Sequence, residues 1–496
     1  MLASGRVNAL TRLYRPSLAL LTDLYQLTMA CAAWEAGVHE REAVFHLSFR
    51  RQPFGGGYSV AAGLEFALDW LEGFSIDAGD AAWLSSLEGP GGETLFPPAF
   101  VTWLSGLRLE LSVDALREGT LVFPHEPLLR VRGPIVACML AETALLNLVN
   151  FQTLVATKAA RICEAARGDA VLEFGLRRAQ GVDGGLAASR GAYIGGCAAT
   201  SNVLAGRLYG IPVRGTHAHS WVMLYGDEQE AFAAYARAMP HNCVFLVDTY
   251  DTLEGVDHAI DIGRALRAQG HTLQGVRLDS GDLAWLSIQA RQKLDAAGFP
   301  EARIYASSDL DEHLITSLKT QGAQIAVWGV GTRLVTCFDD PALGGVYKLS
   351  AVRHAEGAWE ARMKLSEQRA KVSIPGHLQV RRYRDANGFD ADLIWDVEGP
   401  PPSRTLVDPL DHTRRKTVDP SQPYEDLLVP VFRDGRRLEP PEPLEVLRAR
   451  TLEQLASLDA THRRLVHPHE YPVGLEQGLA ERRDALILQL REQSAR

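Results

Sequence analysis

One arginine and two carboxylates follow an apolar run within the segment 276–283. Arg277 and Asp279 are two residues apart, so on a strand their side chains would face the same side. Placing such charges at the end of a buried strand is costly unless they are paired or used. The segment therefore predicts either a structural arginine–aspartate ion pair or a site for a charged ligand, with Asp282 as the second carboxylate.

A second candidate is the turn formed by Gly329, Gly331 and Thr332, after the apolar run that begins at Gln324. Two glycines let backbone N–H groups approach an anion closely, and the threonine adds a hydroxyl donor. Its late position in a series of strand–helix units matches the usual phosphate site of α/β barrels. The same short pattern also fits a plain structural turn.

Two histidines, His217 and His219, are spaced so that both imidazoles could bind one zinc ion from a strand face. No third ligand stands beside them in the sequence at the usual spacing. In the alternative interpretation, one imidazole acts as a nucleophile or as an acid and base, because its pKa lies near neutrality.

Several arginines near glycine-rich segments are candidate phosphate ligands, because planar guanidinium groups bind phosphate in bidentate fashion. Ordinary solvated charge is the alternative for each of them. They are Arg50, Arg51, Arg177, Arg178 and Arg190.

The elements that must position these residues alternate between residues 136 and 350. Short apolar runs that end in small or polar residues are separated by helical patterns, which is typical of βα units around a parallel sheet. Active sites of such folds form where the strands end at their carboxyl sides. The expected strands are 171–175, 211–215, 243–248, 274–279, 303–308, 324–329 and 346–351.

Both flanking regions have a different pattern. Phe45, Leu47 and Phe49 alternate as a strand, and a helix is expected from Ser59 towards Phe74. Proline-rich, charged segments follow residue 395, and a polar helical tail begins at about Leu444. We therefore expect an N-terminal α+β domain (1–135), an α/β barrel (136–350), a return segment to the α+β domain (351–440) and a C-terminal helical region (441–496).

Composition narrows the function classes. The formal net charge of −10 over 496 residues argues against a nucleic-acid binder and against binding to a membrane surface. The long apolar region 134–155 contains Glu142 and Asn147, so no membrane span is expected. Six scattered cysteines without a CxxC pair fit a reduced, cytoplasmic environment. Walker, dinucleotide-binding and HExxH motifs are absent from the sequence.

Taken together, these segments resemble the nicotinate phosphoribosyltransferase family over nearly the whole chain. The resemblance rests on six motifs in a fixed order, which together are far more specific than any single short pattern. They are LTDLYQLTMA at 21–30, FRRQPFGGGY at 49–58, EFGLRRAQG at 173–181, GTHAHS at 215–220, RLDSGD at 277–282 and GVGT at 329–332.

The resemblance implies a type II phosphoribosyltransferase fold, an irregular α/β barrel packed with an α+β domain formed from N- and C-terminal segments. It implies an ATP-coupled ligase that makes nicotinate mononucleotide and pyrophosphate from nicotinate and 5-phosphoribosyl 1-pyrophosphate, the first step of NAD salvage from nicotinate. Mg²⁺ and ATP are the implied cofactors. A homodimer with shared active sites is the implied assembly.

The resemblance also implies residue roles. Tyr25 is similar to the residue that stacks on the pyridine ring, Thr216 and Arg277 to those that hold nicotinate, and His219 to the histidine phosphorylated from ATP. Asp279 would stabilise the reacting sugar. Asp309 departs from the family pattern, where asparagine is frequent. The expected phosphoribosyl pyrophosphate ligands are Arg177, Ser308, Asp309, Gly329, Gly331 and Thr332.

Three other interpretations stay open at this point. The substrate could be another base, nicotinamide or quinolinate, since selectivity turns on a few pocket residues. A zinc-dependent hydrolase could use His217, His219 and a carboxylate such as Asp279. A non-catalytic relative that binds nucleotide is the third, because function need not follow fold.

Overall fold

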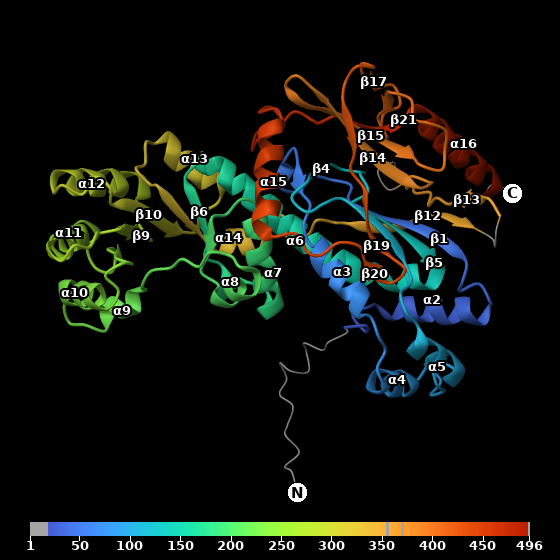
Figure 1. Cartoon of the computed structure of the whole chain (residues 1–496), viewed down its shortest axis with the longest axis horizontal. Helices are drawn as coiled ribbons and strands as arrows, with labels where there is room; N and C mark the ends of the chain where they lie inside the picture. The colour runs from blue at the N-terminus through green and yellow to red at the C-terminus, as the bar shows by residue number, and fades with distance from the viewer. Residues whose placement is uncertain (1–17, 354–356, 369–371, 495–496) are drawn as a thin grey trace, which may run out of the picture.

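The computed structural model describes residues 18–353, 357–368 and 372–494. Its elements form two lobes joined through one long helix (Figure 1). The lobe drawn in green to yellow alternates strands and helices, whereas the other lobe combines blue N-terminal elements with orange and red C-terminal ones. This arrangement confirms the expected α/β fold with a second α+β part built from both ends of the chain.

The first lobe contains a parallel sheet of six strands in the order β7-β6-β11-β10-β9-β8. Its central strands are buried on both faces, as expected for a sheet covered by helices. Within the described part of the chain, no ladder joins β7 to β8, so the barrel is irregular. The strands are β6 (Ala170–Glu173), β7 (Ala199–Thr200), β8 (Val244–Leu246), β9 (Gly275–Leu278), β10 (Arg303–Ser308) and β11 (Val327–Val330).

Four helices of this lobe begin with an aspartate whose carboxylate accepts a backbone N–H of the first turn. These caps are Asp227, Asp251, Asp282 and Asp311. Asp282 therefore caps helix α12 (Leu283–Ala296). The helices are α7 (Gly181–Ile194), α8 (Val203–Tyr209), α9 (His219–Met223), α10 (Glu228–Ala238), α11 (Thr252–Ala268), α12 (Leu283–Ala296), α13 (Glu312–Thr320) and α14 (Thr332–Val335).

The second lobe contains a seven-stranded antiparallel sheet in the order β13-β12-β1-β5-β3-β19-β20. We expected the strand at 346–351 to continue the βα series, but β12 pairs antiparallel with β1, and Ser350 Oγ donates to the carbonyl of Val44. The strands are β1 (Glu42–Ser48), β3 (Ser112–Ala115), β5 (Leu129–Pro134), β12 (Val346–Arg353), β13 (Trp359–Ala361), β19 (Val429–Arg433) and β20 (Arg436–Arg437).

A six-stranded sheet in the order β17-β16-β21-β15-β14-β18 completes this lobe. Its strand β21 lies between α15 and α16 in sequence, so the region after residue 441 is not helical throughout. The elements are β14 (Leu378–Asp385), β15 (Gly388–Asp396), β16 (Thr405–Val407), β17 (Arg415–Thr417), β18 (Tyr424–Asp426), α15 (Leu444–Ser457), β21 (Val473–Glu476) and α16 (Gln477–Ser494).

The helix expected from residue 59 begins later. Residues Ser59–Val60 form β2 and pair with β4 (Leu121–Val122), and α3 (Leu64–Gly73) follows Gly63. At Gly63, φ is +94° and a Cβ would lie 2.3 Å from the carbonyl oxygen of Leu148, so only glycine fits this turn. The remaining helices of this lobe are α2 (Leu24–Glu35), α4 (Ala78–Ser85) and α5 (Pro98–Gly106).

The long helix α6 (Ile135–Ala166) joins the two lobes (Figure 1). By length and composition it could cross a membrane. Its polar residues, however, bond within the protein: Thr153 and Thr157 accept the N–H groups of Ala62 and Val60 at 3.1 and 2.9 Å. These bonds to the β2 segment identify α6 as the central core helix of the fold.

Candidate active site

A cavity of about 800 Å³ opens at the carboxyl ends of the parallel strands. It brings together nine of the residues predicted for the site, although they come from widely separated segments of the chain. These nine are Arg177, Thr216, Arg277, Asp279, Ser308, Asp309, Gly329, Gly331 and Thr332. The strand-end rule for parallel sheets therefore located the cavity correctly.

The guanidinium of Arg277 is the buried cation of this cavity. It donates from Nη1 to Thr216 Oγ1 and from Nη2 to the carbonyl of His217 at 3.1 Å. Its Nε has no hydrogen-bond partner, and burial lowers the pKa of the guanidinium. Within the described residues no carboxylate lies within 4.0 Å of it, so the predicted alternative of an arginine–aspartate ion pair is not formed.

The two histidines are directed to different environments. The His217 ring packs among Phe232, Tyr235 and Phe245, and its Nε2 accepts the N–H of Leu246 at 3.3 Å. Burial lowers the pKa of His217 to about 4, helped by the charge of Arg277. His217 is therefore a neutral, structural histidine.

His219 instead remains 40% exposed at the start of α9. Its Nδ1 lies 3.1 Å from Thr249 Oγ1, whereas its Nε2 lies 3.9 Å from Asp248 Oδ1 and 3.8 Å from Asp279 Oδ2. In the part of the chain that the structure describes, no group of three or more histidine, cysteine or acidic side chains could hold a metal ion. The zinc hydrolase interpretation therefore lacks its metal site.

Asp248 is a site residue that the sequence patterns missed. Its side chain is fully buried, and Oδ2 accepts hydrogen bonds from the backbone N–H of Asp279 at 2.9 Å and from Ser280 Oγ at 2.7 Å. Asp279 in turn accepts from Ser307 Oγ at 2.5 Å. The two aspartates are thus held in fixed positions beside His219, and the polar end of β8 was the available signal.

The glycine turn after β11 is shaped by Phe174. A Cβ on Gly329 would lie 2.7 Å from the Phe174 ring, and a Cβ on Gly331 would lie 3.3 Å from the Phe174 carbonyl oxygen. Glu173, fully buried, accepts hydrogen bonds from the Gly175 N–H and from Thr200 Oγ1 and so fixes the neighbouring strand end. Close packing at the cavity wall therefore excludes a larger side chain at Gly329 unless the turn shifts, whereas at Gly331 the added contact is only tight.

A chain of ion pairs also holds this turn. Arg333, next to Thr332, lies 3.4 Å from Asp339 Oδ1, and Asp339 Oδ2 lies 2.7 Å from Lys158 Nζ. Lys158 also pairs with Glu312 at 2.7 Å, where both side chains are almost fully buried. The turn is therefore anchored to the central helix α6.

Arg190 and Tyr25 lie outside this cluster, whereas Arg178 belongs to it. Arg190 is buried and pairs with Glu118 at 2.7 Å, so it is structural. Arg178 lines the cavity beside Arg177, as an anion ligand would. Tyr25 lies on α2 in the other lobe, 49% exposed, and does not line the cavity of its own chain (Figure 1).

Comparisons with known proteins agree with this geometry. Residues 20–150 match the model of the nicotinate phosphoribosyltransferase N-terminal domain, and residues 378–483 match that of its C-terminal domain. The nicotinate phosphoribosyltransferase of Bacillus subtilis is 43% identical over 466 residues, covering 93% of each chain, and the human enzyme is 37% identical, covering 94% of this chain and 96% of its own.

Solved structures show the same relationship. The crystal structure of human nicotinic acid phosphoribosyltransferase aligns with a TM-score of 0.81 at 35% identity, covering 94% of this chain and all of that one. A nicotinate-nucleotide pyrophosphorylase from Pyrococcus furiosus aligns with a TM-score of 0.65 at 22% identity over 89% of this chain and 96% of that one, which shows the shared fold alone. The family and fold predicted from the motifs are confirmed: the chain belongs to the nicotinate phosphoribosyltransferase family.

Proposed function

We propose that the barrel cavity joins nicotinate to 5-phosphoribosyl 1-pyrophosphate, giving nicotinate mononucleotide and pyrophosphate. The observation that carries this proposal is the buried Arg277 guanidinium, which has no carboxylate partner in the described structure and lies beside the Thr216 hydroxyl. A pyridine carboxylate supplies the missing negative charge and accepts hydrogen bonds from both groups. Nicotinamide, which is neutral, would leave the charge of Arg277 uncompensated.

The phosphoribosyl pyrophosphate would occupy the rest of the cavity. Its volume of about 800 Å³ lies within the range typical of small-ligand sites. Arg177 offers a cation, Ser308 and Thr332 offer hydroxyl groups, and the turn at Gly329 and Gly331 offers closely approachable backbone. These groups suit phosphate oxygens at both ends of the sugar.

The reaction forms a bond from the pyridine nitrogen to C1 of the ribose while the bond from C1 to the pyrophosphate oxygen breaks. Positive charge develops on the sugar during this displacement, and the Asp279 carboxylate lines the same cavity, where it would stabilise that charge. Arg277 and Thr216 would keep the ring nitrogen directed at C1 by holding the carboxylate.

Mg²⁺ fits this cavity as a companion of pyrophosphate. Asp309 lines it, and no hydrogen bond to its carboxylate is formed within the described residues; together with Asp279 it offers the oxygen ligands that Mg²⁺ prefers. Such ions are commonly held by one or two carboxylates plus substrate phosphates, which agrees with the lack of a three-ligand protein cluster among the described residues. When bound, Mg²⁺ would neutralise charge on the leaving pyrophosphate.

ATP coupling would act through His219. Thr249 Oγ1 engages Nδ1, so Nε2 is the nitrogen left to attack the γ-phosphorus of ATP and release ADP. Asp248 and Asp279 lie near that nitrogen and would stabilise the positive charge that the ring develops. The phosphoryl group would then draw cationic side chains into the cavity until water removes it as phosphate.

A homodimer with shared sites would supply Tyr25. This residue projects from α2 together with Leu24 and Met29, which are 53% and 39% exposed, so an apolar surface is available on that helix. In the dimer, Tyr25 of the partner subunit would stack on the pyridine ring and cover the open mouth of the barrel. We expect the dimer to be cytoplasmic.

An activity assay with three bases tests the proposal. The purified protein is incubated with 5-phosphoribosyl 1-pyrophosphate, Mg²⁺ and ATP, and with nicotinate, nicotinamide or quinolinate, and nucleotide products are separated by chromatography. We expect nicotinate mononucleotide to form far faster than the product of either other base. Preference for nicotinamide or quinolinate would refute the substrate assignment, and no product from any base would indicate a non-catalytic relative.

A further inference from the structure

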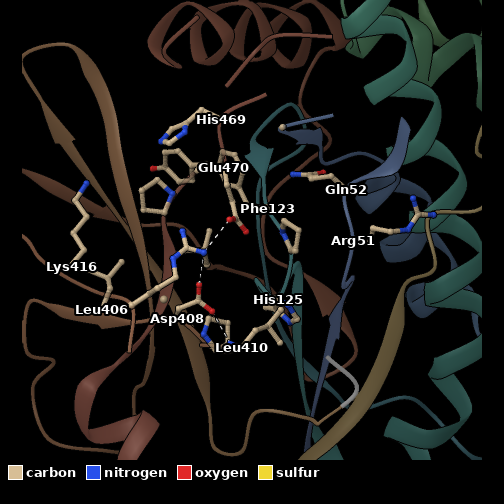
Figure 2. A pocket seen from close by; sticks show the side chains of 18 of the residues that line it. Arg51, Gln52, Phe123, His125, Leu406, Asp408, Leu410, Lys416, His469 and Glu470 are labelled. Atoms are coloured by element: carbon tan, nitrogen blue, oxygen red, sulfur yellow. Dashed lines mark hydrogen bonds and ion pairs between the residues drawn. The ribbon is translucent and has the colours of Figure 1, made fainter. Parts of the chain in front are cut away.

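A second cavity, of about 500 Å³, lies in the other lobe and shares no lining residue with the barrel cavity. Figure 2 shows its two walls: Leu406 and Lys416 come from the C-terminal sheet on one side, and Arg51 and Gln52 come from the N-terminal segment on the other. Of the predicted phosphate ligands, Arg50 and Arg51 line this cavity, and neither has a role in the reaction proposed above.

The walls carry an excess of positive charge. Five cationic side chains line the cavity with two carboxylates: Arg50, Arg51, Arg414, Arg415 and Lys416 with Asp408 and Glu470. Two of the five also pair with carboxylates outside the lining, Arg51 with Asp340 at 3.0 Å and Lys416 with Asp390 at 2.6 Å. The whole chain, by contrast, has a formal net charge of −10, so the cavity is locally positive on a protein that is negative overall. A cavity lined by one sign of charge concentrates ligands of the opposite sign.

Two of these cations have no acidic partner within the described residues. Arg415 is exposed on β17, and its only recorded bond runs from Nε to the carbonyl of His412 at 3.3 Å. Arg50 makes no hydrogen bond or ion pair with any residue that the structure describes, and partial burial lowers the pKa of its guanidinium. Arg414, in comparison, lies 3.4 Å from Asp408 and 3.3 Å from Glu470.

His125 lines this cavity close to the charges of Arg50 and the buried Arg483. His125 adopts φ +73° there, and burial together with the charges of Arg483 and Arg50 lowers its pKa to about 4. Arg483 is only 4% exposed and donates to two backbone carbonyls, those of Pro409 and Val372, rather than to a carboxylate. A bound anion would offset the positive charge of Arg50 and Arg483 beside the neutral His125.

Ring stacking and close backbone contacts hold the walls of the cavity in place. The rings of Phe123 and Tyr471 stack 4.0 Å apart at its floor, and the Tyr471 hydroxyl donates to Asp392 at 3.0 Å. A Cβ on Gly57 would lie 3.0 Å from Pro468 Cβ, and both residues line the cavity, so the N- and C-terminal walls are in direct contact. Rigid walls reduce the ordering cost of binding a small ligand.

From these observations we infer that the cavity between β16–β17 and the segment 50–57 is a binding site for a phosphate monoester of about nucleotide size. Guanidinium groups match the geometry of phosphate oxygens, and Arg415 and Arg50 are available for this contact. The proline and leucine side chains of the walls, including the 40% exposed Leu410, would contact the organic part of the ligand. The volume lies within the usual range for such ligands.

Calorimetric titration of the full chain at physiological salt tests this inference. The probes are AMP and ribose 5-phosphate, with adenosine and ribose as controls that lack the phosphate. The titrations use a Gly329→Ala background, which impairs the barrel turn and so separates this site from the barrel cavity. We expect both phosphate esters to bind, and whichever binds more tightly identifies the organic part that the site prefers.

The decisive variant is Arg415→Glu, compared with Arg436→Glu, which makes the same charge change on an exposed arginine outside the cavity. We expect Arg415→Glu to lose at least tenfold in affinity, which is roughly 1.4 kcal/mol of binding free energy. Arg436→Glu should change the affinity less than twofold, which is less than half of that free energy. The inference would be overturned if both variants bound the phosphate esters with equal affinity or lost affinity equally. It would also be overturned if adenosine bound as tightly as AMP. None of these outcomes depends on the catalytic assignment of the barrel cavity.

Discussion

Asp248 Oδ1 lies 3.9 Å from His219 Nε2 and has no hydrogen-bond donor of its own in the described structure. The other oxygen of this buried carboxylate holds the backbone of Asp279, so the charge beside His219 cannot move away. An unpaired buried carboxylate is costly unless a positive charge develops next to it. This arrangement supports a histidine that becomes cationic when it accepts a phosphoryl group.

Replacing the histidine separates ATP coupling from substrate binding. His219→Ala is expected to abolish the stimulation of product formation by ATP, with only a modest change in the KM for nicotinate, because His219 does not line the nicotinate end of the cavity. Initial rates with and without ATP over a nicotinate series measure both quantities. The matched control His217→Gln should keep ATP stimulation. Loss of stimulation in both variants would contradict the assignment to His219.

Asp248→Asn tests the carboxylate itself. Asparagine can still accept a hydrogen bond from the Asp279 N–H but carries no charge, so the fold should persist while phosphorylation of His219 slows roughly tenfold, or about 1.4 kcal/mol in the barrier. Rapid-quench measurement of acid-labile phosphohistidine from labelled ATP reports this rate. Unchanged phosphorylation would show that the carboxylate has only a structural role.

Arg277→Ala should chiefly impair nicotinate binding. Loss of charge-assisted hydrogen bonds worth about 2 to 3 kcal/mol raises the KM for nicotinate roughly 30- to 150-fold. The KM for 5-phosphoribosyl 1-pyrophosphate should change much less. Arg178→Ala is the comparison variant, since Arg178 lines the same cavity without contacting Thr216. A similar nicotinate defect in both variants would argue against a specific carboxylate receptor.

Replacing a glycine of the turn should impair binding of 5-phosphoribosyl 1-pyrophosphate, whereas Arg277→Ala chiefly impairs binding of nicotinate. In Gly329→Ala the new methyl group would lie 2.7 Å from the Phe174 ring, so the turn must shift. We expect a higher KM for 5-phosphoribosyl 1-pyrophosphate and a lower melting temperature. Gly226→Ala, where nothing lies within 4 Å of the added Cβ, should leave both values unchanged. A normal KM in Gly329→Ala would remove the turn from the phosphate site.

Because several histidines are buried and neutral, we expect acid to destabilise the folded protein. The pKa of His217 is about 4 in the folded state, mainly because of burial, and about 6.5 when the side chain is exposed. Between these two pKa values the unfolded chain binds more protons than the folded chain. The contribution of neutral His217 to the free energy of unfolding is therefore complete above pH ~6.5 and is lost as the pH falls towards 4. His125 and His377 shift in the same direction. Denaturant unfolding from pH 7 to 4 should show this loss as a falling free energy of unfolding. His217→Gln should make the free energy of unfolding less dependent on pH, by up to one bound proton. His241→Gln, at an exposed position, should not have this effect.

The sequence was sufficient to predict five of the six strands of the parallel sheet and the residues at their ends. The expected strand 211–215 forms only an isolated bridge at Val213, and β7 was not expected. Arg277, Thr332 and Asp309 follow apolar runs, and the carboxyl ends of parallel strands meet at one edge, so local pattern and topology point to the same place. Two histidines two residues apart could not be distinguished in this way. Only the aromatic contacts of His217 show that it is structural.

Other features depend on contacts between distant segments. The strand at 346–351 has the apolar pattern of the barrel strands, yet β12 joins β1, because its partner is set by packing and not by its own residues. Asp248 and Glu173 are single carboxylates in apolar runs, and their roles come from donors contributed by other loops. The second cavity combines residues more than three hundred positions apart, Arg50 and Arg415 among them.

A crystal structure of the protein with nicotinate mononucleotide tests the central claim most directly. We predict the pyridine carboxylate within hydrogen-bond distance of Arg277 and Thr216, the phosphate at the turn Gly329–Thr332, and Tyr25 of the partner subunit against the ring. A nucleotide bound elsewhere, or bound in this cavity with its carboxylate directed away from Arg277, would contradict the account.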